Sequence, residues 1–222
     1  MGFLPLTSKT YLTRCSILGL VRFLFNAKKQ YKEITPKISF GTFDDIIVSR
    51  QPRTEEMHGV LEGQHVGADK ITLYQDQDFF RWRYANNHNK YLFIYEIKDK
   101  MITGYIVIQI SPNNRRGYIV DYGQRNGTAI EKIIEFIIKS RHFNILSIYQ
   151  FSLTDTIEHK IRDLNFKKVS LFRTIEKKVY GELPLLIRPV KKNYSDSDFF
   201  VEGLDLRKIE NWHIKGICSD GA

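Results

Sequence analysis

A glycine-containing turn between a strand pattern and a helical pattern is the segment of this chain that could bind a phosphate. Its residues are Gln124-Arg125-Asn126-Gly127-Thr128-Ala129. Backbone N–H groups at a helix start can hold a phosphate, Gly127 allows close approach of the backbone, and Arg125 adds positive charge. An ordinary helix start explains the same residues, because Thr128 and Glu131 have capping-box spacing and could occupy those N–H groups themselves. The turn therefore predicts either a phosphate site or a self-capped helix.

Three residues close to this turn could take part in proton transfer. Asp121 and Tyr122 end the strand before the turn, and Tyr149 lies on the next predicted strand. A buried carboxylate at Asp121 could take a proton from an ammonium group, directly or through water. The alternatives are that Asp121 caps the turn that follows the strand, and that both tyrosines serve in packing.

The cysteines and histidines exclude several kinds of site. Only two cysteines are present, Cys15 and Cys218, near opposite ends of the chain, which excludes a disulfide-rich scaffold and a cysteine-built zinc site. The six histidines are scattered without a metal-binding spacing, so no metal is expected. Both cysteines are expected to be reduced thiols of a cytoplasmic protein.

Composition and charge limit which classes of protein and of partner are possible. The 222 residues, 42% of them hydrophobic, suffice for one large domain or one domain with an appendage. The net charge of +9 favours an anionic partner, such as the phosphates of a cofactor, a nucleic acid or a membrane surface. The basic residues are spread along the chain without a known DNA- or RNA-binding motif, so nucleic acid is not the expected partner.

Hydrophobic patterns predict the elements that would position the turn. Three runs of strand character, 91–97, 102–110 and 117–122, are separated by short turns and predict antiparallel neighbours. Ile130, Ile133, Ile134 and Ile137 then form one apolar helix face. The following strand, 144–151, is expected to run parallel to the third, because a helix connects the two.

A second helix and further strands complete the predicted order. Ile157, Ile161 and Leu164 share one helix face, with Asp155 and Glu158 at capping-box spacing and Asn165 at the expected left-handed stop. A strand over 169–179 and an irregular tail follow. The order β-β-β-α-β-α-β predicts the α+β class: a mixed, mostly antiparallel sheet with a β-α-β-α-β crossover half.

The N-terminal third is expected to differ from the rest. Residues 8–32 predict a helix, so residues 1–35 are interpreted as a helical arm and residues 36–222 as the main domain. The apolar run 15–25 is about half the roughly 20 residues that cross a bilayer, and Arg22 interrupts it. The arm could lie on a membrane surface or, as we expect, pack on its own domain. Residues 37–70 predict one short helix and loops.

Three stretches resemble the GNAT-type N-acetyltransferase superfamily. The turn 124–129 is similar to its acyl-CoA pyrophosphate signature, Q/R-x-x-G-x-G/A, and Leu164-Asn165-Phe166 stands where that superfamily carries Leu-Gly-Phe. The segment Asp78-Phe79-Phe80-Arg81-Trp82-Arg83-Tyr84 resembles the D-x-x-[FL]-x-W-R-Y signature of a bacterial branch that is often encoded among cell-surface polysaccharide genes. The tail Asn211-Trp212-His213-Ile214, with Ser219-Asp220, is similar to the endings of that branch. The resemblance covers about residues 72–180 and the tail.

The resemblance implies an acyl-CoA-dependent N-acyltransferase with a GNAT fold. Acetyl-CoA or another acyl-CoA would be the co-substrate, and the acceptor would be a small-molecule or sugar-linked amine. The resemblance to this branch points to cell-surface polysaccharide or sugar metabolism. The thioester and the amine would meet where the third and fourth predicted strands separate, with Asp121 and Tyr149 as catalytic residues. The residues implied in cofactor binding are Tyr122, Gln124, Arg125, Asn126, Gly127, Thr128 and Ala129.

The chain departs from the superfamily at the usual general acid. The tyrosine that protonates the departing thiolate corresponds to Ile161, and the asparagine at the preceding strand end corresponds to Thr154. The alternative is therefore a catalytically degenerate GNAT-like domain that acts as a binding module. The aromatic residues of the W-R-Y segment are expected to plug the base of the sheet, with one arginine, Arg81 or Arg83, binding a carboxylate of the protein or of an acidic substrate.

Overall fold

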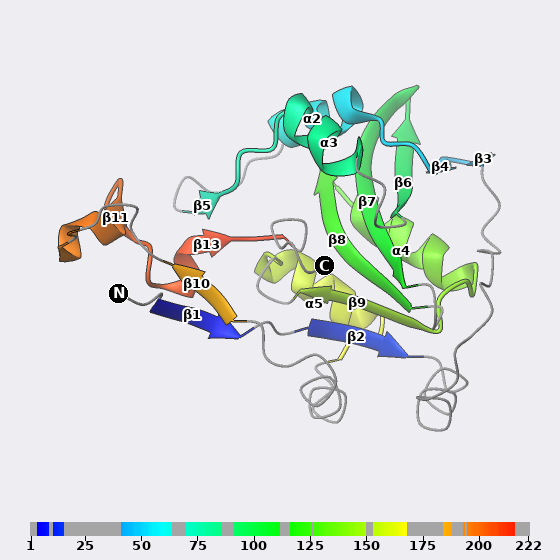
Figure 1. Ribbon diagram of the computed structural model, residues 1–222. Helices are drawn as coiled ribbons and strands as arrows, with labels where there is room; N and C mark the ends of the chain where they lie inside the picture. Colours follow the sequence, from blue (N-terminus) through cyan, green and yellow to red (C-terminus); the bar gives the residue numbers. More distant parts are fainter. Residues whose placement is uncertain are drawn as a thin grey trace.

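The computed structural model of the chain is an α+β structure in which the elements from β6 to α5 follow the expected order (Figure 1). The structure describes residues 4–8, 11–15, 41–63, 70–85, 91–111, 116–125, 127–149, 153–167, 184–187, 193 and 195–215. The expected strand over 169–179 lies outside these residues, as does the predicted helix from residue 16 onward.

A mixed sheet forms the centre of the structure. Within the described ranges its seven strands have the order β2-β9-β8-β7-β6-β4-β3. All neighbours are antiparallel except β8 and β9, which are parallel and connected by a helix as predicted. The strands are β2 (Tyr11–Cys15), β3 (Gly41–Phe43), β4 (Ile46–Ser49), β6 (Tyr91–Lys98), β7 (Met101–Ser111), β8 (Arg116–Gln124) and β9 (Ile145–Tyr149).

Helices cover both faces of this sheet. The helices α2 (Thr54–Glu62) and α3 (Gln77–Ala85) pack on one face, and α4 (Ala129–Lys139) and α5 (Asp155–Asp163) pack on the other. Successive residues of a strand point to opposite faces. In β6, Ile94 therefore joins the core under α4, whereas Phe93 and Tyr95 join the core under α2 and α3.

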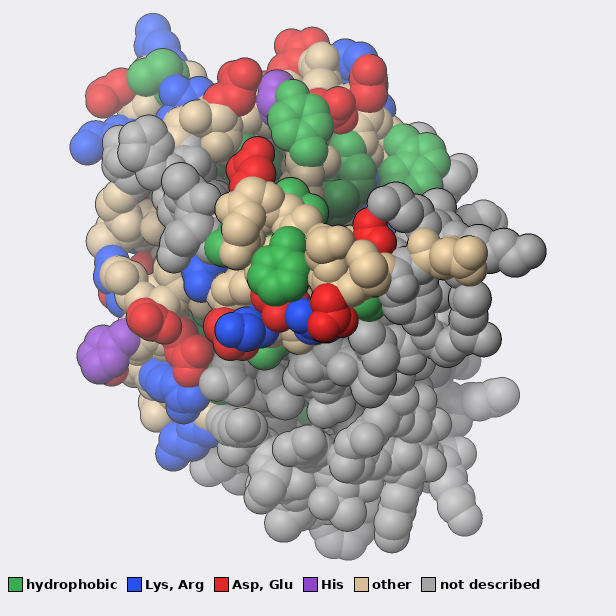
Figure 2. Space-filling model, turned by 90° about the vertical axis from the view of Figure 1, so that its left-hand side faces the viewer, with side chains coloured by type: hydrophobic (Ala, Val, Ile, Leu, Met, Phe, Trp, Pro, Cys, Tyr) green, Lys and Arg blue, Asp and Glu red, His purple; other side chains and the backbone are tan. Residues whose placement is uncertain are grey.

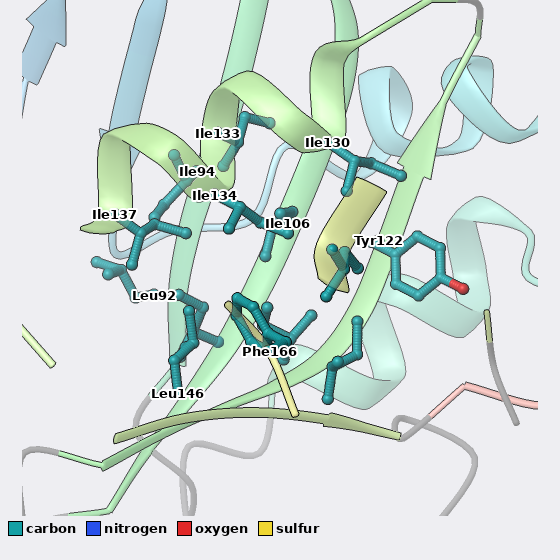
Figure 3. Close-up of a cluster of buried hydrophobic side chains, with 14 of the residues drawn as sticks. Leu92, Ile94, Ile106, Tyr122, Ile130, Ile133, Ile134, Ile137, Leu146 and Phe166 are labelled. Carbon is teal, nitrogen blue, oxygen red and sulfur yellow. The ribbon is translucent and has the colours of Figure 1, made fainter. Parts of the chain in front are cut away.

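The core under α4 follows the predicted apolar face of that helix. Figure 3 shows Ile130, Ile133, Ile134 and Ile137 directed at the sheet residues. Gly104 on β7 allows the helix to begin close to the sheet, because a Cβ there would lie only 2.4 Å from the Cβ of Ala129. The first turn of α4 is thereby held against the end of β8.

Helix α5 begins and ends close to the predicted positions. Its N-cap is Thr154, whose hydroxyl accepts the N–H of Ile157 at 3.4 Å, so the predicted capping role of Asp155 is wrong by one residue. Glu158 instead binds Arg162 one turn later, at 2.6 Å. Asn165 follows the helix with φ of 66°, which confirms the left-handed stop.

The helix predicted over residues 8–32 is wrong where the structure describes that range. Residues 11–15 form β2, which pairs antiparallel with β9 and is joined on its other side to Lys167 by a bridge at Thr13. Leu12 is fully buried in the core, and the Thr13 hydroxyl lies 3.0 Å from that of Ser147. These residues belong to the main sheet, so a helical arm ending at residue 35 does not describe them.

The other N-terminal predictions were partly confirmed. Helix α2 is the short helix expected between residues 37 and 70, but β3 and β4 were not predicted. The strand β1 (Leu4–Ser8) pairs with β10 (Pro184–Ile187). The expected packing of Ile17, Leu20, Val21 and Leu24 against protein lies outside the described residues.

The C-terminal part is irregular with short strands, as predicted. Its strand β13 (Trp212–His213) pairs in parallel with β5 (Ile71–Thr72), the short strand that precedes α3. This pairing brings the residues after His213 to the end of β8. The remaining elements are η2 (Asp196–Phe199), β11 (Phe200–Val201), β12 (Leu204–Asp205) and η3 (Ile209–Asn211).

Candidate functional site

The parallel strands β8 and β9 pair over only part of their length. Their register runs from Arg116 opposite Ile145 to Ile119 opposite Ile148, and residues 120–124 of β8 have no partner in β9. Beyond Ile119, β8 therefore continues without a partner in β9, because β9 ends at Tyr149, one residue past the last pair.

A β-bulge in β8 begins at the same point. Ile119 pairs with Ile108 of β7, but Asp121 pairs with Val107, so Val120 is an extra residue. An extra residue reverses the faces of the side chains that follow it. Tyr122 consequently lies in the core under α4, whereas Asp121 contacts tyrosines on the α3 side of the sheet. Figure 3 shows the Tyr122 hydroxyl directed away from the labelled aliphatic side chains.

Asp121 is a fully buried carboxylate at the centre of a polar cluster. Its Oδ1 accepts the backbone N–H of Tyr122 at 2.8 Å. Its Oδ2 lies 3.3 Å from the hydroxyl of Tyr105 and 3.5 Å from that of Tyr84 and from Nε2 of Gln75. The last three contacts are long for hydrogen bonds, so the ionised carboxylate needs a closer partner.

Lys215 is that partner. Its Nζ lies 3.1 Å from Asp121 Oδ1, 3.2 Å from Gln75 Oε1 and 2.6 Å from the backbone carbonyl oxygen of Tyr122. It also lies 5.2 Å from the centre of the Tyr122 ring. These oxygens match the three N–H donors of an ammonium group. The expectation that Asp121 merely caps the turn is therefore wrong, because its carboxylate forms a buried ion pair.

The local sequence explains how Gln75 reaches the cluster. The side chain of Asp76 accepts the N–H of Phe79 at 2.7 Å and so caps α3. Gln75 stands one residue before this cap and is buried, at the end of the segment that leads from β5. On α3 itself, Phe80 and Tyr84 are buried beside Tyr105, as the W-R-Y segment predicted.

The cluster contains two tyrosines that stay protonated at neutral pH. Burial, with the negative charge of Asp121, raises the pKa of Tyr84 and of Tyr105 well above the ordinary value of 10.0. Both phenols are therefore hydrogen-bond donors to Asp121. Their role in the present arrangement is to stabilise its negative charge rather than to give up a proton.

His213 lies beside this cluster in β13 and is buried. Burial, with the positive charges of Lys215 and Lys70, lowers the pKa of His213 from 6.5 to about 4. Its Nε2 has no hydrogen-bond partner among the described residues. At neutral pH the imidazole is therefore uncharged, and the only cation that contacts Asp121 within the described ranges is Lys215.

The turn 124–129 has the backbone of an open helix start. Gly127 has φ of 86°, a conformation that favours glycine, and a Cβ there would meet no atom within 4 Å. Thr128 is the N-cap of α4 but makes no side-chain cap, and Glu131 pairs with Lys160 at 3.2 Å. The predicted capping box is therefore not formed. Gln124 Oε1 accepts the N–H of Ile130 at 3.3 Å.

The other residues of the turn have separate surroundings. Arg125 is exposed, its backbone N–H binds the carbonyl of Thr103 at 2.9 Å, and its side chain lies along α2 against Gly59 and Gly63. Ala129 is buried as the first residue of α4. Asn126 lies outside the described residues. Tyr149 ends β9 opposite Tyr11 of β2, and its side chain also lies outside the described part.

A small hollow of about 10 Å³ adjoins the turn, between α4 and α5. Gln124, Thr128 and Glu131 line it on the α4 side, and Lys160, Ile161 and Leu164 line it on the α5 side. Ile161 is 1% exposed and part of the hydrophobic core. The position that corresponds to the usual general acid is therefore a packing position.

The two arginines of the W-R-Y segment have different surroundings. Arg81 binds Asp78 at 3.2 Å and Glu55 of α2 at 3.8 Å, so it pairs with carboxylates of the protein itself, one of the expected roles. Arg83 is half-buried in the same helix. Trp82 was expected to plug the sheet, but it is 63% exposed and that expectation is wrong. Phe80 and Tyr84 fill the space instead.

On the face drawn in Figure 2, the described charged side chains do not form a large patch of one sign. There the described Lys and Arg side chains alternate with Asp and Glu, and hydrophobic side chains are scattered between them. In the described ranges, no helix is long and apolar enough to cross a membrane. The same ranges contain no group of three His, Cys, Asp or Glu residues that could hold a metal ion.

Sequence reasoning placed Asp121 at this site but missed three of its neighbours. Lys215, Gln75 and Tyr105 come from the tail, the segment before α3, and β7. The available signals were weak: a lone lysine in the apolar stretch Ile214 to Cys218, and a glutamine before a helix cap. Comparison of the chain with known protein families gave no match, and comparison with curated proteins gave none either.

Proposed function

We propose that this chain is a GNAT-like, acyl-CoA-dependent N-acyltransferase. The observation that carries the proposal is the part of β8 beyond Ile119, which has no partner in β9 and carries the fully buried carboxylate of Asp121. The unpaired side of this part of β8 would receive the thioester of acetyl-CoA or another acyl-CoA, and the acceptor would be a small-molecule or sugar-linked amine.

The start of α4 supports an acyl-CoA as co-substrate. Thr128 makes no side-chain cap, and the space in front of Gly127 is open, although Gln124 Oε1 already accepts the N–H of Ile130. The remaining N–H groups and the positive end of the helix dipole suit the pyrophosphate, and Arg125 would add a cation if its side chain left α2. The hollow between α4 and α5 continues the same surface.

Asp121 would accept the proton of the acceptor. The distance of 3.1 Å between Lys215 Nζ and Asp121 Oδ1 demonstrates that an ammonium can lie within proton-transfer distance of this carboxylate. The neutral amine would attack the thioester carbonyl and form the C–N bond, and collapse of the tetrahedral intermediate would break the C–S bond. The nitrogen, cationic after the attack, would lose its second proton through water to the departing thiolate of coenzyme A, and Asp121 would return the first proton to solvent.

Two features of the site limit the reaction. The N–H of Tyr122 is bound to Asp121, so polarisation of the thioester carbonyl would need another N–H of β8. Ile161 supplies no acid, which favours the second candidate, a degenerate GNAT-like domain that binds a ligand without acyl transfer. Acetyl-CoA binding without acyl transfer to any amine would identify that case.

The proposal is tested by calorimetry with acetyl-CoA. The wild type should bind, and Gly127→Val should bind at least tenfold more weakly, because the added side chain fills the space that the pyrophosphate needs. Gly203→Val is the matched control: Gly203 has φ of 82° and open space around its Cβ, but it lies between β11 and β12, remote from the turn in sequence. If the wild type shows no heat at millimolar acetyl-CoA, the proposed co-substrate is wrong. If both variants bind like the wild type, the site lies elsewhere.

A further inference from the structure

The surroundings of Lys215 Nζ are those of a site for a primary ammonium group. Three oxygens from two parts of the fold lie within 3.2 Å of it: a carboxylate of Asp121, the amide oxygen of Gln75 and the backbone oxygen of Tyr122. The face of the Tyr122 ring lies beside it at 5.2 Å. An ammonium has three donors, so each finds an acceptor, while the ring adds cation–π attraction. We name these three residues the ammonium cradle.

The cradle is built without the residue that occupies it. Asp121 and Tyr122 belong to β8, and Gln75 precedes the capped start of α3. Lys215 comes from the tail segment, residues 206–215, which is connected to β5 by a pairing only two residues long. Removal of the tail segment would leave a buried carboxylate without a cation, which is strongly unfavourable. Lys215 can therefore be replaced in the cradle, but only by another cation.

The position of the cradle connects it with the proposed reaction. Tyr122 lies three residues beyond Ile119, in the part of β8 that has no partner in β9. An ammonium bound there lies within proton-transfer distance of Asp121, as the acceptor of an acyl group must. At present the side chain of Lys215 supplies the ammonium group at this position and at this distance from Asp121.

We propose that the ammonium cradle is the acceptor site, that the acceptor is a primary alkylamine, and that Lys215 occupies this site as an internal substitute until the acceptor displaces it. The inference rests on the proposed function for its acyl-transfer part, whereas binding of an ammonium by the cradle is independent of any acyl-CoA. Displacement would move the tail segment away from β5, so the tail would act as a regulatory element that closes the site. A purely structural ion pair is the alternative.

Lys215→Ala in the full chain provides the test, because it removes the atoms from Cγ to Nζ and these correspond to n-propylamine. We expect this variant to unfold at a lower temperature than the wild type, and n-propylamine to restore the unfolding temperature in a saturable way. The neutral isostere 1-propanol should have no such effect. Lys208→Ala is the matched control, since Lys208 is an exposed lysine of the same segment and n-propylamine should not change its stability.

Two further measurements cover a variant that fails to fold. The refolding yield of Lys215→Ala should then rise with n-propylamine and not with 1-propanol. The double variant Asp121→Asn/Lys215→Met should fold without a buried charge and should not respond to the amine. If n-propylamine neither stabilises Lys215→Ala nor raises its refolding yield, the cradle is not an ammonium site and the inference is overturned.

Acyl transfer separates the inference from the proposed function. With acetyl-CoA present, Lys215→Ala should acetylate n-propylamine at least tenfold faster than the wild type, because its cradle is free. Stabilisation by n-propylamine without any acetylation, in a variant that does bind acetyl-CoA, would overturn the acceptor role while leaving an ammonium site. Stabilisation by the amine with no binding of acetyl-CoA would overturn the proposed function instead.

Discussion

Replacement of Lys215 by methionine should destabilise the fold by about 3–5 kcal/mol, because it leaves the carboxylate of Asp121 buried and unpaired. The structure supports this magnitude. The two charges lie 3.1 Å apart, and Lys215 and Asp121 are only 5% and 0% exposed. At an effective dielectric constant of about 20, opposite charges at that distance attract by about 5 kcal/mol. Loss of the bonds to Gln75 and Tyr122 would add to the cost.

The partner variants determine whether this cost arises from the ion pair. Asp121→Asn alone should also destabilise, because it leaves the ammonium of Lys215 buried without a counter-charge. The double variant Asp121→Asn/Lys215→Met should regain most of the loss, since a neutral pair needs no compensation. The coupling energy of this double-mutant cycle is therefore expected to be about 3 kcal/mol or more.

Urea unfolding followed by tryptophan fluorescence and circular dichroism measures each free energy of unfolding. The slopes against urea must agree between variants, so that differences in midpoint report stability alone. Two results would refute the reasoning: a cost below about 1 kcal/mol for Lys215→Met, or single-variant costs that simply add in the double variant. Either result would mean that Asp121 and Lys215 are not coupled in a dry interior.

Two further predictions concern neighbouring residues. The pKa of His213 is about 4 in the folded state and 6.5 in the unfolded state, so as pH falls from 6.5 to 4 only the unfolded chain gains this proton, and stability should fall by up to roughly 3 kcal/mol. Urea titrations of His213→Gln at successive pH values should lack this part of the pH dependence. An unchanged profile would contradict the assignment. Gly104→Ala should lower the free energy of unfolding by about 1–3 kcal/mol and weaken any ligand binding at the start of α4, because the new methyl group would lie 2.4 Å from that of Ala129. Thermal unfolding checks this. An unfolding temperature equal to that of the wild type would mean that α4 can shift freely.

Local patterns in the sequence were sufficient to predict the middle of the sheet, β6, β7, β8 and β9, and the helices α4 and α5 on one of its faces. Runs of strand character predicted β6, β7 and β8, and the isoleucine spacing predicted α4 and its buried face. The helical connection between β8 and β9 implied their parallel pairing. These features depend on residues close together in the chain, where side-chain period and turn chemistry decide the conformation. Asn165 likewise adopted the positive φ expected of the helix stop.

The tertiary structure alone decided β2 and the composition of the candidate site. Residues 11–15 form a strand because the free edge of β9 and the backbone of Lys167 offer hydrogen bonds on both sides, contacts 130 or more residues away in sequence. The bulge at Val120 turned Asp121 toward α3, which a regular alternation along β8 would not have indicated. Lys215 then reached Asp121 across the fold. Non-local pairing and burial of charge leave no periodic signal, so only the assembled chain determines which residues share the site.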